Sequence, residues 1–344
     1  MSTNFANRLI SARKMAGLSL QELSDRMDKP VSRQALSKYE QGKMQPDSSA
    51  LLSLSSVLGV RPDYFFREPA HLSAIKFRKH ARLPEKERER IEAKSLDMLE
   101  RYRELESCLG MDSSFVHPFP GAVLASFDDA GNFADKLREA WNLGIDPIPD
   151  VVEMLENYHV RVIMIDTPDG FDGLSAWSGD IPVIVFNKNR DIVRRRFTVL
   201  HEMAHLLFRC EAATPRENEK LAHAFAGAFL CPKESFLRSF GEKRTHFTER
   251  ELLDMKEYFG ISVQAIMVRA KGLDVISEFT YNNFWIAWSK YRIHEPGEYR
   301  SKEEPARFRQ LLDRAASEEI ITMSKAAELA GKSYNELVEE MSFI

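Results

Sequence analysis

The stretch His201-Glu-Met-Ala-His205 is the feature that most restricts how this chain can fold. It lies in an apolar frame, with Phe197-Thr-Val-Leu200 before it and Leu206-Leu-Phe208 after it. Residues four apart lie on one face of a helix, so both imidazoles can reach the same metal ion. Glu202 would lie beside that ion and could accept a proton from a water bound there. Burying two histidines and a glutamate without a role is costly, so a metal-binding helix is favoured over an amphipathic helix that carries them by chance.

A catalytic zinc ion usually has three protein ligands, so a third must be found. The longer metzincin pattern needs a glycine and a histidine where this chain has Phe208 and Glu211, and it is therefore excluded. A glutamate on a following helix is the other common solution. Glu219 starts a long apolar helical segment that runs to Pro232, and His223 lies one turn further on the same face. Both residues are candidates, and Glu211 and Glu217 are weaker ones.

The first 66 residues predict a set of short helices with clear end signals. Gly17 ends the first helix, and Gly42 ends the third. Ser19, with Glu22 at the capping-box position, starts a second helix over 20–27, and Ser32 starts the third, over 33–41. A fourth helix follows Pro46-Asp-Ser48. Two short helices joined by a turn, the second rich in serine, arginine, glutamine and lysine, are what a DNA-binding helix-turn-helix requires.

This N-terminal stretch resembles the XRE-type, phage-repressor-like helix-turn-helix family. The resemblance is carried by residues 8–13, by Gly17-Leu-Ser-Leu-Gln-Glu-Leu23, by residues 32–42, and by Leu58-Gly-Val60 with Tyr64-Phe65. It implies an all-α, lambda-repressor-like domain that binds a double-stranded DNA operator. It also implies which side chains would face DNA: Gln21, Ser32, Arg33, Gln34, Ser37 and Lys38. The alternative for each of them is a solvated position on a helix surface.

Residues 84–110 predict a highly charged helix. Ile91, Ser95, Met98, Tyr102, Leu105 and Leu109 recur at alternating steps of four and three, as in a coiled-coil seam. Three heptads are few for a coiled coil that stands alone. Packing of this helix on the next domain is therefore slightly preferred to a role in dimerisation, although a homodimer would suit paired operator half-sites.

Residues 112–121 form the clearest linker, and the segments after it alternate between helix and strand. Helices are expected over 134–141 and up to Glu156, and strands over 160–165 and 183–186, before the helix with the histidine pair. A sheet that precedes a metal-binding helix is the layout expected of zinc peptidases, in which an edge strand can hold an extended peptide.

Residues 134–232 resemble the ImmA/IrrE metallopeptidase family. The matching motifs are Arg196-Phe-Thr-Val-Leu-His-Glu-Met-Ala-His-Leu-Leu207, Glu219 with Ala222-His223 and Phe225-Ala226, Leu230-Cys-Pro232, and upstream Leu137–Gly144 and Asp172-Gly173. The resemblance implies a zincin-like domain with one Zn²⁺ per chain, or another divalent ion such as Mn²⁺. It also implies that Glu219 is the third ligand and Glu202 the general base. The family usually has asparagine or aspartate at position 223, so His223 would either orient a ligand imidazole or act as a ligand itself.

Charge and composition limit the remaining possibilities. Residues 1–110 carry a net charge of +5, so the other 234 residues carry −9 of the total of −4, and only the N-terminal part is expected to bind a polyanion. The chain has neither an apolar run long enough to span a membrane nor a signal-peptide pattern. Its three cysteines, Cys108, Cys210 and Cys231, are far apart, so no disulfide framework is expected and a cytoplasmic location fits best.

These patterns predict a mainly α protein with a small β-sheet (α+β) and four segments. They are a helix-turn-helix domain over 1–68, a charged helical linker over 69–120, a metallopeptidase domain over 121–275 and a helical C-terminal region of unknown role over 276–344. The aromatic run Phe279–Trp288 is more consistent with core packing than with a partner surface. Two short capped helices are expected over 324–331 and 333–337.

The predicted function is that of a transcriptional regulator coupled to a zinc endopeptidase. By family resemblance, its substrate would be a regulatory protein such as a repressor, encoded by a neighbouring gene and cleaved in a stress or mobile-element response. The alternative is a non-proteolytic transcription factor or antitoxin with a structural or sensory metal site. The presence of Glu202 favours the enzyme, because a purely structural site needs no general base. In a third hypothesis the helix-turn-helix binds only protein, but the net charge of +4 over residues 1–46 argues against it.

Overall fold

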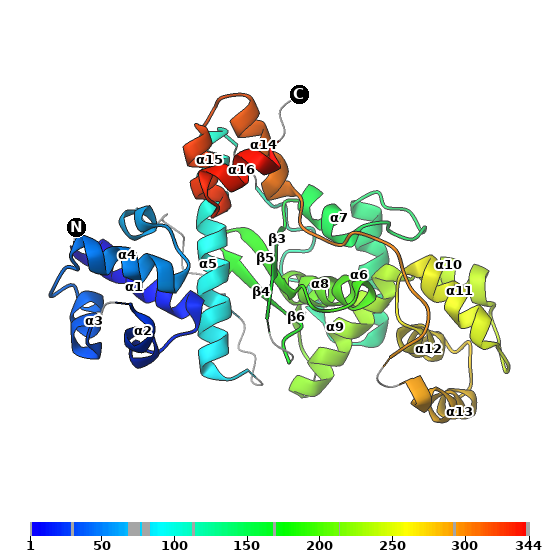
Figure 1. The fold of residues 1–344 in the computed structure, drawn as a ribbon. Coiled ribbons are helices and arrows are strands. Elements are labelled where there is room, and N and C mark those ends of the chain that lie inside the picture. The colour runs from blue at the N-terminus through cyan, green and yellow to red at the C-terminus, as the bar shows by residue number, and fades with distance from the viewer. Residues whose placement is uncertain are drawn as a thin grey trace. The chain divides into compact units, whose positions relative to one another are not determined.

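The computed structural model describes residues 2–28, 31–67, 76–77, 83–111, 114–167, 170–212, 214–291 and 294–341. Within the expected linker over 69–120, residues 69–75, 78–82 and 112–113 lie outside the described residues. The chain forms two compact units, the first made of residues 1–113 with 306–344 and the second of residues 114–305. Figure 1 labels the helices and strands of both units.

The helix-turn-helix part of the first unit is a cluster of short helices, and each predicted end signal is present. The helices are α1 (Ser2–Ala16), α2 (Leu20–Arg26), α3 (Arg33–Glu40), α4 (Ser48–Leu58) and the 3-10 helix η1 (Pro62–Phe66). Ser19 Oγ accepts the Glu22 N–H at 3.1 Å, and Glu22 Oε2 accepts the Ser19 N–H at 2.6 Å, which completes the predicted capping box. The core of this cluster consists of fully buried side chains: Leu9, Leu23, Leu36, Leu54 and Phe65.

The rest of the first unit is formed by the two-residue strand β1 (Lys76–Phe77), the long helix α5 (Glu85–Cys108) and three C-terminal helices. These are α14 (Arg307–Ser317), α15 (Met323–Ala330) and α16 (Tyr334–Glu340). Helix α5 packs on α1 along one side and on α14 and α15 along another. Of the expected seam, Ile91, Ser95, Tyr102 and Leu105 are buried in this unit. The seam therefore packs on the preceding and the C-terminal helices of its own unit, whereas the sequence favoured the next domain.

Three paired strands of the second unit form the part of the sheet that supports the histidine helix. Its strands are β3 (Arg161–Ile165), β4 (Gly173–Ser178) and β5 (Ile181–Asn187), in the order β4-β5-β3. β5 runs parallel to β3, with Arg161 opposite Val183, and antiparallel to β4, with Gly173 opposite Phe186. The central strand β5 is rich in branched apolar residues and buried, as expected for a strand covered on both faces.

Helices surround this sheet. The histidine helix α8 (Ile192–Leu207) packs on β4, β5, α7 (Val151–Asn157) and α9 (Pro215–Leu230), and α9 packs in turn on α6 (Phe127–Ala140). The short strand β6 (Arg209–Cys210) directly follows α8. It pairs in parallel with β2 (Val123–Leu124), which precedes α6. Together these helices and strands enclose one large apolar core that includes the buried side of α8.

Four more helices complete the second unit: α10 (Lys233–Phe240), α11 (Glu249–Phe259), α12 (Val263–Gly272) and α13 (Glu278–Trp288), followed by the 3-10 helix η2 (Ser289–Tyr291). In the aromatic run on α13, Phe284 and Trp288 are buried in the core, while Phe279 and Ile286 are largely exposed. Core packing thus accounts for one side of this helix only. After η2 the described chain continues over residues 294–305 without helix or strand.

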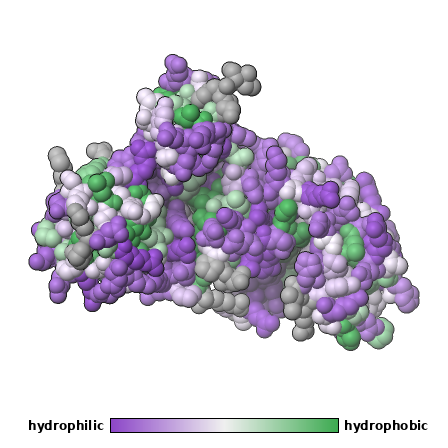
Figure 2. Space-filling view, in the orientation of Figure 1, coloured by the Kyte–Doolittle hydropathy of each residue, from purple (hydrophilic) through white to green (hydrophobic). Residues whose placement is uncertain are grey.

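The predicted fold class, mainly α with a small sheet, is confirmed. The compact units divide the chain differently from the four expected segments, because α5 and α14–α16 share a core. Within the described residues no helix combines the length and the apolar character that a membrane span requires. Where apolar residues reach the surface, on the face shown in Figure 2 they form small separate patches among hydrophilic ones.

Candidate metal centre

Helix α8 brings the two histidines together. Asp191 caps the helix by accepting the Arg194 N–H at 2.9 Å, and apolar side chains bury most of its surface. His201 and His205 are one turn apart, and their Nε2 atoms lie 3.1 Å from each other. The two rings are almost perpendicular, with centroids 4.6 Å apart. Their nitrogens therefore converge on one point beside the helix, as the spacing predicted.

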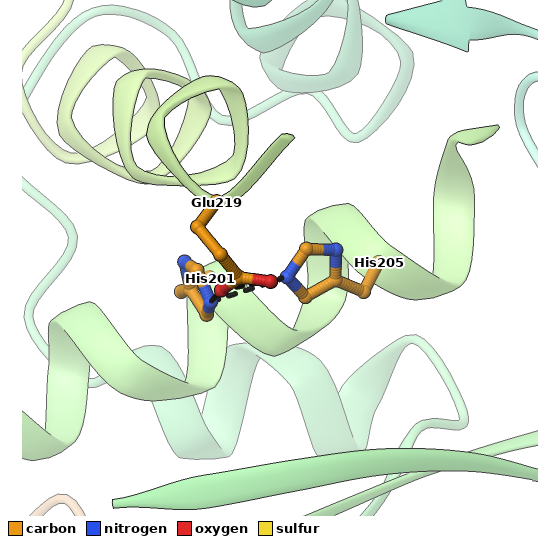
Figure 3. A group of neighbouring side chains, drawn as sticks. All are labelled: His201, His205 and Glu219. Carbon is orange, nitrogen blue, oxygen red and sulfur yellow. Dashed lines mark hydrogen bonds and ion pairs between the residues drawn. The ribbon is translucent and has the colours of Figure 1, made fainter. Parts of the chain in front are cut away.

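Glu219 approaches the same point from α9. Thr214 caps this helix and Pro215 occupies its first turn, so Glu219 lies one turn inside it. The Glu219 Oε2 atom is 3.2 Å from His201 Nε2 and 3.7 Å from His205 Nε2. Figure 3 shows the carboxylate pointing at both imidazoles. Among the described residues, these three are the group of metal-ligating side chains whose ligand atoms all lie within 4.8 Å of one another.

The spacing of these three atoms fits a metal ion. Ligands about 2.0–2.1 Å from a tetrahedral zinc ion are about 3.3 Å from each other, close to the separations of the three atoms here. Two neutral imidazoles and a carboxylate are a donor set that zinc accepts in catalytic sites, with a fourth position left for water or substrate. The Glu219 side chain is 43% exposed whereas His201 and His205 are nearly buried, so solvent reaches the group from the side of α9.

Glu202 points to the sheet side of α8. It is buried, and its Oε2 accepts a hydrogen bond from Ser175 Oγ on β4 at 2.8 Å. Gly173, two residues earlier on the same face of β4, makes this close approach possible. A Cβ at Gly173 would lie 2.6 Å from Thr198 Cγ2 and 3.3 Å from Glu202 Cγ. Sequence reasoning missed Ser175, although the period of two along a strand places it on the same face as Gly173.

His223 lies beside the group without joining it. Its ring centroid is 4.4 Å from that of His201 and 5.6 Å from that of Phe197, with interplanar angles of 31° and 28°. The His223 ring is thus packed between two aromatic neighbours, while the outer part of the residue is exposed. Burial, and next the positive charge that His201 can carry, lower the pKa of His223 to about 4, so its imidazole is neutral at pH 7.

The weaker candidates for the third ligand have other contacts. Glu211 pairs with Arg209 at 2.6 Å, and Glu217 interacts with the cap residue Thr214 at the start of α9.

The side chains expected to face DNA lie on the outer surface of α2 and α3. Gln21, Ser32, Arg33, Gln34 and Lys38 are exposed and Ser37 is half-buried, while Leu36 and Tyr39 of the same helix point into the core. Ser32 also caps α3 by accepting the Ala35 N–H at 3.2 Å. Gln21 donates to Asp25 at 2.8 Å, and Ser37 accepts from Gln41 at 3.0 Å.

Comparison with known proteins agrees with both parts of the chain. A helix-turn-helix family model matches residues 9–65, and the IrrE N-terminal-like domain model of the M78 peptidases matches residues 155–271. Over 63 residues the chain is 38% identical to the SPbeta prophage-derived uncharacterized HTH-type transcriptional regulator YonR of Bacillus subtilis (strain 168). This match covers 18% of the chain and 56% of that relative, so the chain spans little more than half of the relative's length.

Fold, site and comparisons together define a helix-turn-helix protein that also contains a metallopeptidase-like domain. More specifically, the chain carries an XRE-type helix-turn-helix at its N-terminus, followed by an IrrE/ImmA-like domain of the M78 peptidase family. M78 domains are typically metal-dependent, and the described chain contains a possible histidine and glutamate metal site.

Proposed function

We propose that this protein is a DNA-binding transcriptional regulator with a zinc-dependent endopeptidase that cleaves a regulatory protein. His201, His205 and Glu219 bind the metal in this proposal, and Glu202 is the catalytic base. The observation that carries it is the convergence of three ligand atoms at 3.1–3.7 Å beside a buried glutamate. A structural zinc site has four protein ligands and needs no such base, which favours the enzyme over the sensory or antitoxin alternative.

The residues around the metal have separate tasks. When bound, zinc would polarise the scissile carbonyl and acidify water. Glu202 accepts the proton of the attacking water and later donates it to the leaving amine. Ser175 holds the Glu202 carboxylate in one orientation through its 2.8 Å hydrogen bond. His223 supports the His201 ring by packing against it, and we therefore assign the third metal bond to Glu219.

The regulatory half of the proposal concerns residues 1–68. Their XRE-type fold supports binding of a double-stranded DNA operator, with Gln21, Ser32, Arg33, Gln34, Ser37 and Lys38 on the binding face. The substrate would be a repressor-like protein from a neighbouring gene. A homodimer on a two-fold symmetric operator and a cytoplasmic location complete the proposal.

Glu202→Gln tests the enzyme. The variant keeps the shape of the side chain but cannot accept a proton, so it should bind zinc like the wild type and fail to cleave the co-expressed product of the neighbouring gene. Intact mass spectrometry of that product is the measurement. Glu211→Gln is the matched control, because Glu211 is exposed and pairs with Arg209. Cleavage that continues in the Glu202 variant would exclude this mechanism.

The DNA-binding half is tested with the full chain on duplex DNA from upstream of its own gene. Replacing Arg33 and Lys38 by alanine should weaken binding and reduce its salt dependence, because each phosphate contact releases counterions. The control replaces Arg238 and Lys243, two exposed cations of the second unit. Equal binding by both double variants in a gel shift at low salt would argue against this face.

A further inference from the structure

Residues 294–305 form an extended segment, here called the strap. Two of its glutamates each accept backbone N–H groups at the N-terminus of a helix. Glu295 accepts the Val263 and Gln264 N–H groups at the start of α12, at 2.9 and 3.3 Å. Glu303 accepts the Val151 and Val152 N–H groups at the start of α7, each at 3.1 Å. A carboxylate is favoured at a helix N-terminus because it satisfies free N–H groups and complements the helix dipole. Figure 1 shows the strap as the orange trace that leads to α14.

Glu295 and Glu303 each also pair with a buried cation, but the two cations lie on different helices. Glu295 pairs with Lys256 of α11 at 3.1 Å. Glu303 pairs with Arg196, which belongs to the histidine helix α8, and both partners of this second pair are fully buried. Of these two carboxylates, only Glu303 therefore reaches the helix that carries His201 and His205.

The Arg196 side chain is fully buried beside Glu303. Its guanidinium donates to the carbonyls of Gly260 at 3.1 Å, Pro149 at 3.2 Å and Ile148 at 2.7 Å. It also lies over the ring of Tyr299 from the strap, 4.6 Å from the ring centroid. A guanidinium without a carboxylate is unstable in such a place, because a buried charge needs an opposite one. Burial raises the pKa of Glu303, and the charge of Arg196 acts in the opposite direction.

The Arg196–Glu303 ion pair is linked to the metal ligands in two ways. Arg196 is five residues before His201 on one continuous helix, and a helix transmits a shift of one turn to the next. Phe197, the neighbour of Arg196, packs on His223, which packs on His201. A shift of the Arg196 turn would therefore move both the helix and the ring that supports His201.

We propose that the strap positions the metal helix, and that Glu303 is a positioning residue for the metal site through its ion pair with Arg196. This inference rests on the proposed function only in taking His201, His205 and Glu219 as the metal ligands. The strap continues directly into Ala306, where the chain re-enters the first unit and leads to α14.

Because Glu295 and Glu303 make similar contacts, variants of the two residues can be compared directly. In the full-length protein, Glu303→Gln should weaken zinc binding about 10-fold, the lower end of the range found when direct partners of metal ligands are lost, because Glu303 acts on the ligands through Arg196. Glu295→Gln removes the same charge from the same kind of cap, and should leave zinc affinity at the wild-type value. Zinc affinity is measured by competition with a chromophoric chelator. The absorption bands of the Co²⁺-substituted protein should change in the Glu303 variant alone, which a general loss of stability would not produce.

The possible outcomes separate this inference from the proposed function. If the wild type and Glu303→Gln bind zinc equally, the positioning role is wrong and the metal site stands. If Glu295→Gln weakens zinc binding as much as Glu303→Gln does, the effect is general destabilisation and the inference also fails. If the wild type binds no zinc, the proposed function fails, and the inference fails with it.

A second variant covers the case in which Glu303→Gln does not fold. Tyr299→Leu removes the ring under Arg196 but leaves the ion pair, so a smaller weakening of zinc binding, about several-fold, is expected. Tyr258→Leu, at a half-exposed position on α11, is the control. Zinc affinity unchanged by Tyr299→Leu would overturn the inference in this case.

Discussion

At Gly173, strand β4 approaches helix α8 so closely that a single methyl group has no space. An added Cβ would lie 2.6 Å from Thr198 Cγ2 and 3.1 Å from the backbone carbonyl oxygen of Val185. The same approach brings Ser175 within hydrogen-bond distance of Glu202. The absence of a side chain at one position is therefore part of the construction of the site.

Gly173→Ala should consequently destabilise the protein by about 1–3 kcal/mol, as overpacking of a tight interior contact does. It should also displace Glu202, because the Glu202 side chain is among the atoms that the new methyl group would meet. Gly131→Ala is the control. Gly131 lies inside α6, and no neighbouring atom would lie within 4 Å of the new Cβ. Alanine there should therefore raise the free energy of unfolding by up to about 1 kcal/mol. Urea unfolding measures both, and equal free energies of unfolding for the two variants would contradict the argument.

Residue by residue, the sequence predicted the local parts of the candidate site and missed the non-local ones. The step of four between His201 and His205 fixes a shared helix face wherever the helix lies. Ser175 is 27 residues from Glu202, and no local pattern links the two. Glu219 was assigned through family resemblance, because spacing alone left His223, Glu211 and Glu217 open. The distances from Glu219 to the two histidines depend on how α9 packs on α8.

At the scale of elements, α5 shows the limit of a periodic pattern. Its apolar residues recur as in a coiled coil, and period alone does not identify the partner. In the structure Tyr102 and Leu105 form a core with α14 and α15, while salt bridges from Arg8 and Arg67 to Glu100 and Glu104 join α5 to the helix-turn-helix part. Four of the six seam residues, Ile91, Ser95, Tyr102 and Leu105, are thus buried within one chain.

Leu105→Ala tests this packing. Leu105 is fully buried, so the variant should lose about 2–5 kcal/mol of stability, and the loss should be the same at every protein concentration because the contact is within one chain. Leu52→Ala, the same change at an exposed position of α4, should cost within about 0.5 kcal/mol. Denaturant titrations over a wide range of protein concentration measure both. A loss for Leu105→Ala that varies with concentration would indicate a seam between chains.

At the scale of the whole molecule, the chain forms two units that share no core cluster. The first unit contains two such clusters and is discontinuous in sequence. The C-terminal helices return to α5 after the whole of the second unit. The strap that leads back to them carries Glu295, which is half-buried, and Glu303, which is fully buried. The segment that pairs with Arg196 of helix α8 thus leads directly into the last three helices.

Metal removal should therefore affect the two units differently. Two thermal transitions are expected in calorimetry, because each unit has its own core. Zinc at about 100 times its dissociation constant should stabilise the unit that binds it by about 2.7 kcal/mol and leave the other transition in place. His205→Ala should abolish this response and keep both transitions. A shift of both transitions by zinc in the wild type would mean that the stabilities of the two units are coupled.

The sequence by itself determined whatever depends on neighbours within a few residues: the capped helices of the helix-turn-helix, the mainly α fold class and the histidine pair on one helix face. These follow from backbone periodicity and capping, which act over a turn or two. Tertiary structure alone decided where the α5 seam is buried, that Ser175 holds Glu202, and that Glu303 reaches Arg196 from 107 residues away. Such contacts join groups far apart in the chain, and only packing brings them within the few ångströms over which hydrogen bonds and buried ion pairs act.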